Sequence, residues 1–538
     1  MKSLIKKLSR KKLNLFLIFC CIGFLIYANS FKVPFFADDN DNVVNNIYIK
    51  DWKYLPKLFS ENLIAGAGLL SNYWRPLLLL TFSIDYHLFG LNKYWFHFVD
   101  ISLHIINAYL IFIILQILLK RNGLSFLVAL IFLIHPIQIE AVTCITGRAD
   151  PLYLLFLLLS IYLYLKSITP NGEIRFYYFS LLSFIASLLS KEIAIILPVL
   201  LVILEISFNK RWTIKSVFLR TIAFFVLAAI YFLSRLTILN FKNILNFYDF
   251  NSVYVQSALV RILTFLKVLL IYFGLLSFPH DLYMERDLPP VTSFEWSSRT
   301  SVLILIVISY LIIRRFSKNK IYFFGFGLFF IALAPASGIF IPINAIIYEH
   351  WLYLPMVGFF LAILSLGEEI LKDRFKRLTT FFLLSYLIFL AVTTVKTNFN
   401  WKDPITFYNH ILKYNHTSIR VWNNLGMAYA DANELDKAID AYKEAIALDK
   451  ESISAPPHHN LANAYLAKGM KEEAIKEYRK AIDIDERFIY SYNNLLALYL
   501  QAGRHAEAIP ILEKKLKLSP NDNVTRDILN TLYKLPKK

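Results

Sequence analysis

The stretch FHFVDISLHIINAYLIFIILQILL, residues 96–119, decides the class of this protein. It contains one carboxylate, Asp100, and two histidines, His97 and His104, among apolar or uncharged residues. A helix rises about 1.5 Å per residue, so this stretch would be about 36 Å long and would exceed the ~30 Å hydrocarbon core of a bilayer. The stretch therefore predicts a helix that crosses a membrane.

Similar apolar runs recur from residue 13 to residue 396 and then stop. The chain is 57% hydrophobic and only 18% charged, which is far more apolar than a water-soluble protein. We predict an all-α fold: a basic cytoplasmic N-terminus (1–12), a polytopic membrane bundle (13–397) and a water-soluble tail (398–538). The eleven predicted crossings lie at about 13–28, 96–119, 124–142, 150–166, 176–190, 191–208, 217–238, 300–316, 321–341, 351–371 and 378–396.

The formal net charge of +18 indicates topology and not nucleic-acid binding. Lys and Arg gather in short loops between apolar runs, which is the bias of cytoplasmic loops. If residues 1–12 are cytoplasmic, the long loop 30–95 lies outside. The first apolar run also resembles a cleaved signal peptide, but the residues that follow it, 28–30, form a poor cleavage site, so we expect it to be retained.

The apolar stretch 256–278 does not fit this alternation. Counted as a crossing, it would place the basic residues 314–320 outside. It also contains Arg261 and Lys267, whose charges are costly in the middle of a membrane. We expect an in-plane or re-entrant helix on the outer side, which puts the tail on the same side as loop 30–95.

The tail repeats itself with a period close to 34 residues, which is typical of tetratricopeptide-type helix-turn-helix units. Trp422, Gly426 and Tyr442 occupy helix-packing positions of the first unit, and equivalent residues recur twice. The predicted units span about 419–452, 455–488 and 489–522, and a capping helix follows at 523–535. We expect an α-solenoid whose concave face holds a peptide or protein ligand; a structural appendage is the alternative.

Two adjacent acids, Asp38 and Asp39, lie in the outer loop just after the first predicted crossing. Paired carboxylates can hold a divalent cation such as Mg²⁺ or Mn²⁺, or act as a general base on an acceptor hydroxyl. A solvated acidic loop is the alternative. We therefore treat both acids as candidate catalytic residues and as candidate metal ligands.

Further ionisable residues fall at the outer ends of predicted crossings, where they are costly unless they pair or bind something. The cations among them could bind a lipid phosphate. Alternatively, ion pairs among them, for example Arg148 with Asp150 or Glu140, could stabilise the fold. These candidate donor-binding or site-supporting residues are Arg75, His97, His104, His135, Glu140, Arg148, Asp150, Lys191, Glu192, Arg235, Arg261, Glu349 and His350.

The order of these residues resembles one known family along essentially the whole chain. The shared features are the Asp-Asp loop, Trp74-Arg75-Pro76-Leu77, Phe96-His97, His135-Pro136 with Glu140 and Val142, Gly147-Arg148-Ala149-Asp150, Lys191-Glu192, Leu352-Tyr353-Leu354-Pro355 and the terminal repeats. The chain thereby resembles the transmembrane and tetratricopeptide-repeat O-mannosyltransferases. It departs from them at Asp100, where members often have Asn, and at His350, where they often have Arg.

The resemblance implies a fold similar to the multi-spanning GT-C glycosyltransferases and a polyprenyl-phosphate sugar donor used on the non-cytoplasmic face. It also implies that an acid of the first loop is the base, that the reaction inverts the anomeric carbon, and that the sugar is mannose. The acceptor is expected to be Ser or Thr of an exported protein held by the repeats.

A non-enzymatic membrane scaffold that gathers envelope proteins through its repeats is the competing function. A transporter fits less well, since the charges cluster at one face and not at the bilayer midplane. The expected location is a bacterial inner membrane with the tail on the extracytoplasmic side, or an endoplasmic-reticulum membrane in a eukaryote.

Overall fold

The computed structural model describes residues 2–209, 211–237, 252–316, 319–343, 345–371 and 376–534. Within these ranges the chain forms helices and no strand. It divides into two compact units, residues 1–402 and residues 403–538. The all-α fold predicted from the sequence is therefore confirmed.

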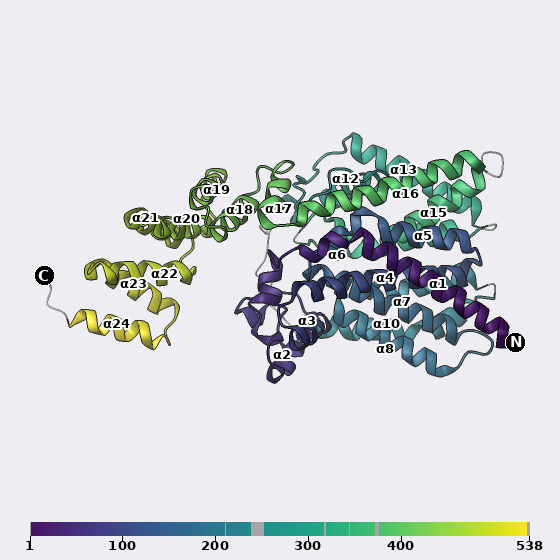
Figure 1. Cartoon of the computed structure of the whole chain (residues 1–538), viewed down its shortest axis with the longest axis horizontal. Coiled ribbons are helices and arrows are strands. Elements are labelled where there is room, and N and C mark those ends of the chain that lie inside the picture. Colours follow the sequence, from purple (N-terminus) through teal and green to yellow (C-terminus); the bar gives the residue numbers. More distant parts are fainter. Residues whose placement is uncertain are drawn as a thin grey trace. The chain divides into compact units, whose positions relative to one another are not determined.

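Unit 1 contains the apolar helices of the chain. Its helices are α1 (Lys2–Ile26), α2 (Leu55–Ser60), α3 (Pro76–Phe89), α4 (Lys93–Leu119), α5 (Asn122–Ile134), α6 (Ile139–Thr143), α7 (Ala149–Ser167), α8 (Ile174–Ser190), α9 (Leu197–Phe208), α10 (Ile214–Thr237), α11 (Val253–Gln256), α12 (Ala258–Ser277), α13 (Trp296–Arg315), α14 (Ile321–Leu333), α15 (Pro355–Leu371) and α16 (Lys376–Asn398). Figure 1 shows α1, α4 and α16 running lengthwise through this unit, with α2 and α3 at the end away from the start of α1.

Among the described residues, six helices are long and apolar enough to cross a membrane: α4, α7, α10, α12, α13 and α16. A seventh span results if α5 and the segment Pro136–Thr143, which bend by 52° at His135, count as one. Shorter apolar helices begin at Lys12, Pro76, Ile174 and Ile321. The protein is therefore a multi-pass membrane protein, and the number of eleven crossings stays a prediction.

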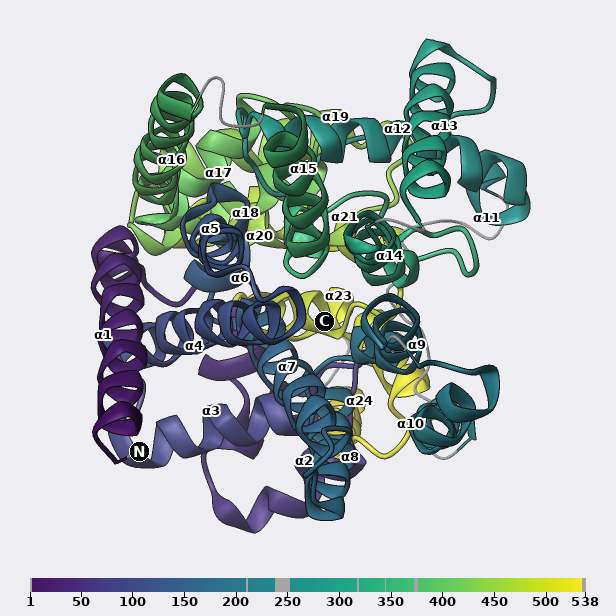
Figure 2. The ribbon, with the colours of Figure 1, turned by 90° about the vertical axis from the view of Figure 1, so that its right-hand side faces the viewer.

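The long helices differ in how much of their surface the protein itself covers. Within their most apolar windows, 67% of the α7 residues and 56% of the α4 residues are buried, against 22% for α13 and 11% for α16. Figure 2 shows α4 and α7 towards the middle of unit 1, with α13 and α16 at its edge. The exposed apolar side chains of α13 and α16 are consistent with a lipid-facing position. The helices α4 and α7 form the core of the unit and carry several of its buried polar residues.

Two glycines allow α14 and α15 to pack at short range. A Cβ atom on Gly358 would lie 2.3 Å from the carbonyl oxygen of Gly325, and one on Gly325 would lie 2.8 Å from the carbonyl oxygen of Gly358. Small residues at facing positions are the usual means by which helices approach closely in a membrane. This contact fixes the start of α15, which follows the Leu352-Tyr353-Leu354-Pro355 motif.

The apolar stretch 256–278, which does not fit the predicted alternation of crossings, contains the continuous helix α12. Its two cations, Arg261 and Lys267, both have partners. Arg261 donates to the carbonyl oxygens of Val255 (2.8 Å) and Ile339 (3.3 Å), and Lys267 lies 3.3 Å from a carboxylate oxygen of Glu295. The helix is long and apolar enough to cross. The in-plane or re-entrant placement of α12 stays a prediction. These contacts reduce the free-energy cost of burying the two charges, which was one reason for that prediction.

Loop 30–95 is more ordered than the sequence indicated. It contains the helix α2, several short 3-10 turns and the apolar helix α3. With 14 residues, α3 is too short to cross a bilayer. Its buried face, which includes Leu78 and Phe82, packs in one cluster with Phe96 and Ala149. This packing fixes the loop against α4 and α7.

Unit 2 is a series of helix pairs. Its helices are α17 (Pro404–Leu412), α18 (Ile419–Asp431), α19 (Leu435–Leu448), α20 (Ala455–Ala467), α21 (Lys471–Ile484), α22 (Ile489–Gln501), α23 (His505–Leu518) and α24 (Asn523–Tyr533). The pairs α18–α19, α20–α21 and α22–α23 match the three predicted repeats, and α24 occupies the predicted cap, whose last residue, 535, lies outside the described residues.

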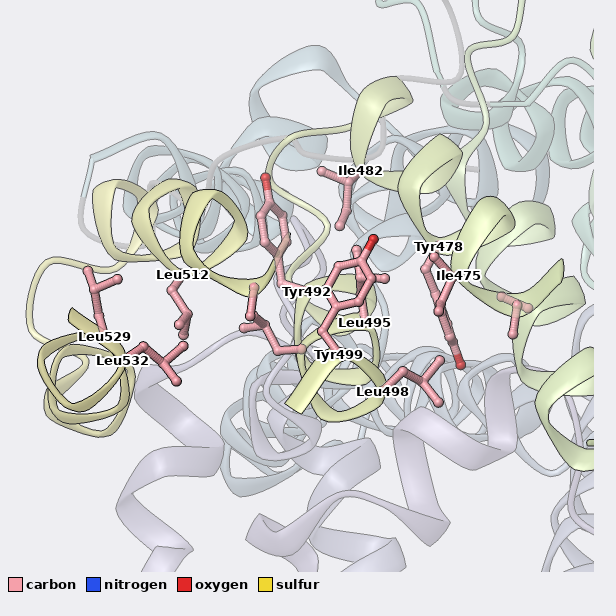
Figure 3. Close-up of a cluster of buried hydrophobic side chains, with 14 residues drawn as sticks. Ile475, Tyr478, Ile482, Tyr492, Leu495, Leu498, Tyr499, Leu512, Leu529 and Leu532 are labelled. Carbon is pink, nitrogen blue, oxygen red and sulfur yellow. The ribbon is translucent and has the colours of Figure 1, made fainter. Parts of the chain in front are cut away.

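The core of unit 2 is continuous from one pair to the next. Figure 3 shows the rings of Tyr478, Tyr492 and Tyr499 packed with Leu495 and the side chains around it, in a cluster that extends from α20 to α24. Each pair buries its apolar face only against its neighbours, as a solenoid requires.

Substitution of Gly426 by valine is expected to destabilise unit 2 by about 1–3 kcal/mol, because it overpacks a filled site. A Cβ atom on Gly426 would lie 2.5 Å from the Tyr442 ring, which is buried. Denaturant unfolding monitored by tryptophan fluorescence measures the effect. Ala467→Val, at an exposed position, is the control; equal midpoints for the two variants would contradict the prediction.

Candidate functional site

Asp39 is the buried carboxylate of the outer loop. Only 2% of its surface is exposed, and its Oδ1 accepts a hydrogen bond from the backbone N–H of Thr146 (2.9 Å). Its Oδ2 accepts a longer one from the N–H of Phe36 (3.5 Å). Burial raises the pKa of Asp39 to about 7, although these hydrogen bonds lower it. The carboxyl group is thus held in a fixed position with a pKa suited to proton transfer near neutral pH.

Asp38 is exposed, unlike its neighbour, and it lies within electrostatic range of Tyr73. Burial raises the pKa of the Tyr73 hydroxyl; the charge of Arg75 lowers it, and those of Glu192 and Asp38 raise it. Tyr73 therefore lies near Asp38, Glu192, Arg75 and Arg235, so these residues belong to one polar region.

Arg75 forms a two-pronged ion pair at this place. Its Nε and Nη2 atoms donate to the two carboxylate oxygens of Glu192 at 3.1 and 2.7 Å, and its guanidinium lies 4.8 Å from the centre of the Tyr73 ring. Arg235, on α10, donates to the carbonyl oxygen of Asn72 and also acts on Glu192. Two cations, Arg75 and Arg235, thus act on one carboxylate, that of Glu192.

Lys191 and Asp150 form a second ion pair, and it is almost fully buried. The Lys191 Nζ atom lies 2.7 and 2.8 Å from the Asp150 carboxylate oxygens, and both side chains are about 5% exposed. The pair joins the start of α7 to the turn before α9. We expect it to position the neighbouring residue Glu192, since an ion pair that uses both carboxylate oxygens leaves the lysine little freedom.

Glu140 and Glu349 are two buried carboxylates within electrostatic range of each other. The Oε1 and Oε2 atoms of Glu140 bond the ring Nδ1 (2.8 Å) and the backbone N–H (3.1 Å) of His350. Glu349 accepts from Arg286 at 2.8 Å. Burial raises the pKa of Glu349 to about 7; Arg286 opposes this effect, and Glu140 adds to it. The His350 that departs from the family pattern is therefore the partner of Glu140.

Arg148 supports the fold and does not face the site. It is fully buried, and it pairs with Asp85 of α3 and Asp100 of α4. It also donates to the carbonyl oxygen of Phe96 at 3.1 Å. The expected pair with Asp150 or Glu140 is not formed, because the guanidinium points between α3 and α4. Gly147 makes this turn possible, since a Cβ atom there would lie 2.6 Å from the carbonyl oxygen of Glu140.

The three predicted histidines, two on α4 and one directly after α5, are buried and bond different parts of the fold. The Nε2 atoms of His97, His104 and His135 lie 3.0 to 3.1 Å from three backbone carbonyl oxygens. His104 also bonds the Tyr353 hydroxyl at 2.8 Å. His97 and His104 share a helix with Asp100, but the three do not form one cluster. Arg261 donates to the backbone carbonyl oxygens of Tyr254, Val255 and Ile339.

Two residues of these networks, Asp85 and Arg286, are absent from the sequence-based candidates. Asp85 lies in the middle of an apolar helix, and an isolated acid in such a helix is a signal that a buried cation is near. Arg286 lies in a polar loop between two helices, where nothing in the sequence marks it.

The sequence also made the acidic pair a candidate for a divalent cation. Among the described residues, no group of three or more His, Cys, Asp or Glu side chains is placed to hold a metal ion. Metal binding by Asp38 and Asp39 stays a prediction.

Comparison of the chain with known proteins finds similarity to a repeat family and to a group of membrane proteins. The tetratricopeptide-repeat family model matches residues 419–452, 455–488 and 489–522. Protein O-mannosyl-transferase TMTC3 of Homo sapiens is 25% identical over 476 residues, which cover 82% of this chain and 52% of that protein. Protein O-mannosyl-transferase F38B6.6 of Caenorhabditis elegans is 26% identical, with 80% and 62% covered. Protein O-mannosyl-transferase tmtc2 of Xenopus laevis is 24% identical, also with 80% and 62% covered.

The chain spans about half the length of the first of these relatives, and the similarity includes both its membrane unit and its tail. The repeats and the relatives confirm the resemblance predicted from the sequence. The protein is a relative of the transmembrane and tetratricopeptide-repeat O-mannosyltransferases, and its tail is a tetratricopeptide-repeat solenoid.

Proposed function

We propose that this protein is a membrane glycosyltransferase that moves mannose from a polyprenyl phosphate to Ser or Thr hydroxyls of exported proteins on the non-cytoplasmic face. The observation that carries the proposal is Asp39: a buried carboxylate with a pKa near 7, fixed by two backbone N–H groups, in a relative of protein O-mannosyl-transferases. A membrane scaffold would have no need of such a group.

The proposed reaction is a single displacement. The acceptor oxygen forms a bond to the anomeric carbon, while the bond between that carbon and the phosphate oxygen breaks and its electron pair leaves with the phosphate. The proton of the acceptor hydroxyl passes to the Asp39 carboxylate. One positioned base contributes about 10² to 10⁴ in rate, so removal of this proton is a large part of the chemistry.

Arg75 and Arg235 are the proposed contacts of the leaving phosphate. Glu192 holds Arg75 in place through an ion pair, and Arg235 is held by the carbonyl oxygen of Asn72. The side chain of Arg75 is 14% exposed and that of Glu192 is 31% exposed, so the pair can be reached from outside the protein. Cations placed where negative charge develops stabilise the transition state more than the bound substrate.

Purified protein in liposomes tests the proposal. With a mannosyl-phosphoryl polyprenol and a Ser/Thr peptide on the side of loop 30–95, we expect mannosylated peptide by mass spectrometry. A second preparation with the donor omitted is the control. Peptide that binds but never acquires a sugar would support the scaffold alternative and contradict the transferase.

The rate of transfer is expected to rise with pH through about 7, because Asp39 must be ionised to accept the proton. Below that pKa the rate falls about tenfold per pH unit, since only the ionised fraction is active. Fold stability should change in the opposite direction: the folded-state pKa lies above the ordinary value of 3.8, so its stabilising contribution is present at low pH and lost as pH rises through about 7. A rate that is flat from pH 5 to pH 8 would contradict the assignment of Asp39 as the base.

A further inference from the structure

The C-terminal end of α16 carries two buried side chains that nothing in the proposed reaction uses. Asn398, the last residue of α16, is 1% exposed, and Trp401, in the 3-10 turn that follows, is 7% exposed. Both belong to unit 1, and the chain passes into unit 2 directly after residue 402. Their contacts form two separate routes to the backbone N–H groups that bond the Asp39 carboxylate.

The first route starts at the Asn398 amide. Its Nδ2 atom donates to Oδ1 of Asn29 at 2.6 Å and to Oγ of Ser30 at 2.7 Å. Its Oδ1 atom accepts from the Thr143 hydroxyl at 2.6 Å, and the hydroxyls of Ser30 and Thr143 bond each other at 3.0 Å. Because the NH₂ group of an amide can donate only two hydrogen bonds, Asn398 uses both of its donors here. The end of α16 is thus bonded to the segment after α1 and to the end of α6.

The end of α6 leads directly to Asp39. Thr143 is the last residue of α6 and lies three residues before Thr146, whose N–H bonds Oδ1 of Asp39. The turn between them is closed by a hydrogen bond of 3.0 Å from the N–H of Gly147 to the carbonyl oxygen of Cys144. The Cys144 Sγ atom lies 3.8 Å from Oδ1 of Asp39. A turn this short leaves the N–H of Thr146 little freedom while Thr143 is held.

The second route is the packing of the Trp401 ring against the Phe36 ring. Their centres lie 6.2 Å apart, and both side chains are buried. Phe36 begins the turn that contains Asp39: its carbonyl oxygen accepts from the Asp39 N–H at 3.1 Å, and its own N–H donates to Oδ2 of Asp39. Ala37, inside this turn, has a φ of 51°, which is unfavourable for alanine. Such a conformation persists only where its surroundings hold it, and the Trp401 ring is part of those surroundings.

We propose that Asn398 and Trp401 are positioning residues that hold the Asp39 carboxylate in place for proton transfer. Asn398 acts through Thr143 on the N–H of Thr146. Trp401 acts through Phe36 on the turn that contains Asp39. The inference rests on the proposed function, because it concerns the base of that reaction.

This role predicts which kinetic constant depends on the end of α16. A reacting group that is misplaced by about 1 Å can lower a rate about 10²-fold. Asn398 and Trp401 act on the removal of the acceptor proton and not on the binding of donor or peptide. Their loss should therefore lower kcat and leave both KM values unchanged.

Steady-state transfer by the full-length protein in liposomes tests the proposal. We expect Asn398→Ala and Trp401→Ala each to lower kcat by about 10²-fold without a change in KM. Trp401→Phe, which keeps an aromatic ring beside Phe36, should restore most of the lost rate. Phe399→Ala is the matched control and should leave the rate unchanged, because Phe399 belongs to the same 3-10 turn and is 55% exposed.

A second comparison separates positioning from a general loss of stability. In an Asp39→Asn background the base is already absent, so Asn398→Ala and Trp401→Ala should cause no further fall in the residual rate. A fall of the same size in both backgrounds would overturn the proposal, since the two residues would then not act through Asp39.

Alkylation of Cys144 by iodoacetamide, measured by mass spectrometry without any sugar donor, tests the geometry independently of transfer. Because Cys144 lies beside Asp39, we expect Asn398→Ala and Trp401→Ala to speed its alkylation by about tenfold or more, and Phe399→Ala to leave it unchanged. Unchanged alkylation in the first two variants would overturn the proposal. If Asp39→Asn leaves transfer intact, Asp39 is not the base and the proposed function fails, whereas the alkylation result still decides whether the end of α16 holds this carboxylate.

Discussion

Replacement of Asp39 by asparagine is expected to lower the rate of sugar transfer by about 10² to 10⁴ while the protein stays folded. Asparagine has nearly the same shape, and its carbonyl can accept the 2.9 Å hydrogen bond from Thr146. Its NH₂ group then faces the N–H of Phe36, where the aspartate contact is the longer one at 3.5 Å. Because an ionised carboxylate is costly to bury, the neutral variant should be as stable as the original or more stable.

Two further variants show whether the loss of rate is specific to Asp39. Asp51→Asn removes an exposed carboxylate from the same loop; asparagine can replace it as the acceptor for the N–H of Lys53, so transfer should be unchanged. Asp38→Asn removes the exposed member of the acidic pair. If Asp38→Asn abolishes transfer and Asp39→Asn does not, the exposed acid is the base. If neither variant affects the rate in membranes that contain normal amounts of protein, the transferase proposal fails.

Replacement of Arg148 by methionine is expected to destabilise unit 1 by about 3–5 kcal/mol, the largest effect on stability that we predict. The substitution leaves Asp85 and Asp100 buried without a cation, and methionine fills much of the space of the arginine stem. It also removes the contact with the Phe82 ring, whose centre lies 4.7 Å from the guanidinium. Loss of the thermal unfolding transition in detergent, or a large downward shift of its midpoint, measures the effect.

Compensating substitutions separate charge from packing at this position. Asp85→Asn with Asp100→Asn, added to Arg148→Met, should restore part of the lost stability, because the orphaned charges are then absent. Asp100→Asn alone should cost little, since Arg148 keeps Asp85 as its counter-ion. Arg175→Met is the control: its pair with Glu173 is more than half exposed on both sides and should contribute at most about 1 kcal/mol. A shift for Arg148→Met no larger than that of this control would contradict the assigned role.

The parts of the fold that depend on local pattern could be predicted from the sequence. Apolar runs and the 34-residue period are properties of neighbouring residues, so the membrane helices and the three repeats were recognisable without knowledge of the contacts. The helix α3 was missed because it has only 14 residues, too few for a crossing, and the sequence alone did not indicate what it would pack against.

The partners of the buried ionisable residues could not be predicted, because they are distant in sequence. Arg148 has Asp150 two residues away and Glu140 eight residues away, but its partners are 63 and 48 residues distant. The Gly147 turn decides the direction in which the guanidinium points, and that direction is a property of the packed helices. The same is true of Asp39, whose carboxylate accepts a hydrogen bond from a backbone N–H group that lies 107 residues further along the chain.

The segment from Thr146 to Asp150 has an evolutionary consequence. Alternate residues along it serve different partners: Thr146 holds Asp39, Arg148 holds α3 to α4, and Asp150 holds Lys191. A single inserted or deleted residue would shift all three contacts out of register at once. We therefore expect divergence in this segment to proceed by substitution alone, so that its length should be more constant among relatives than the identity of its residues.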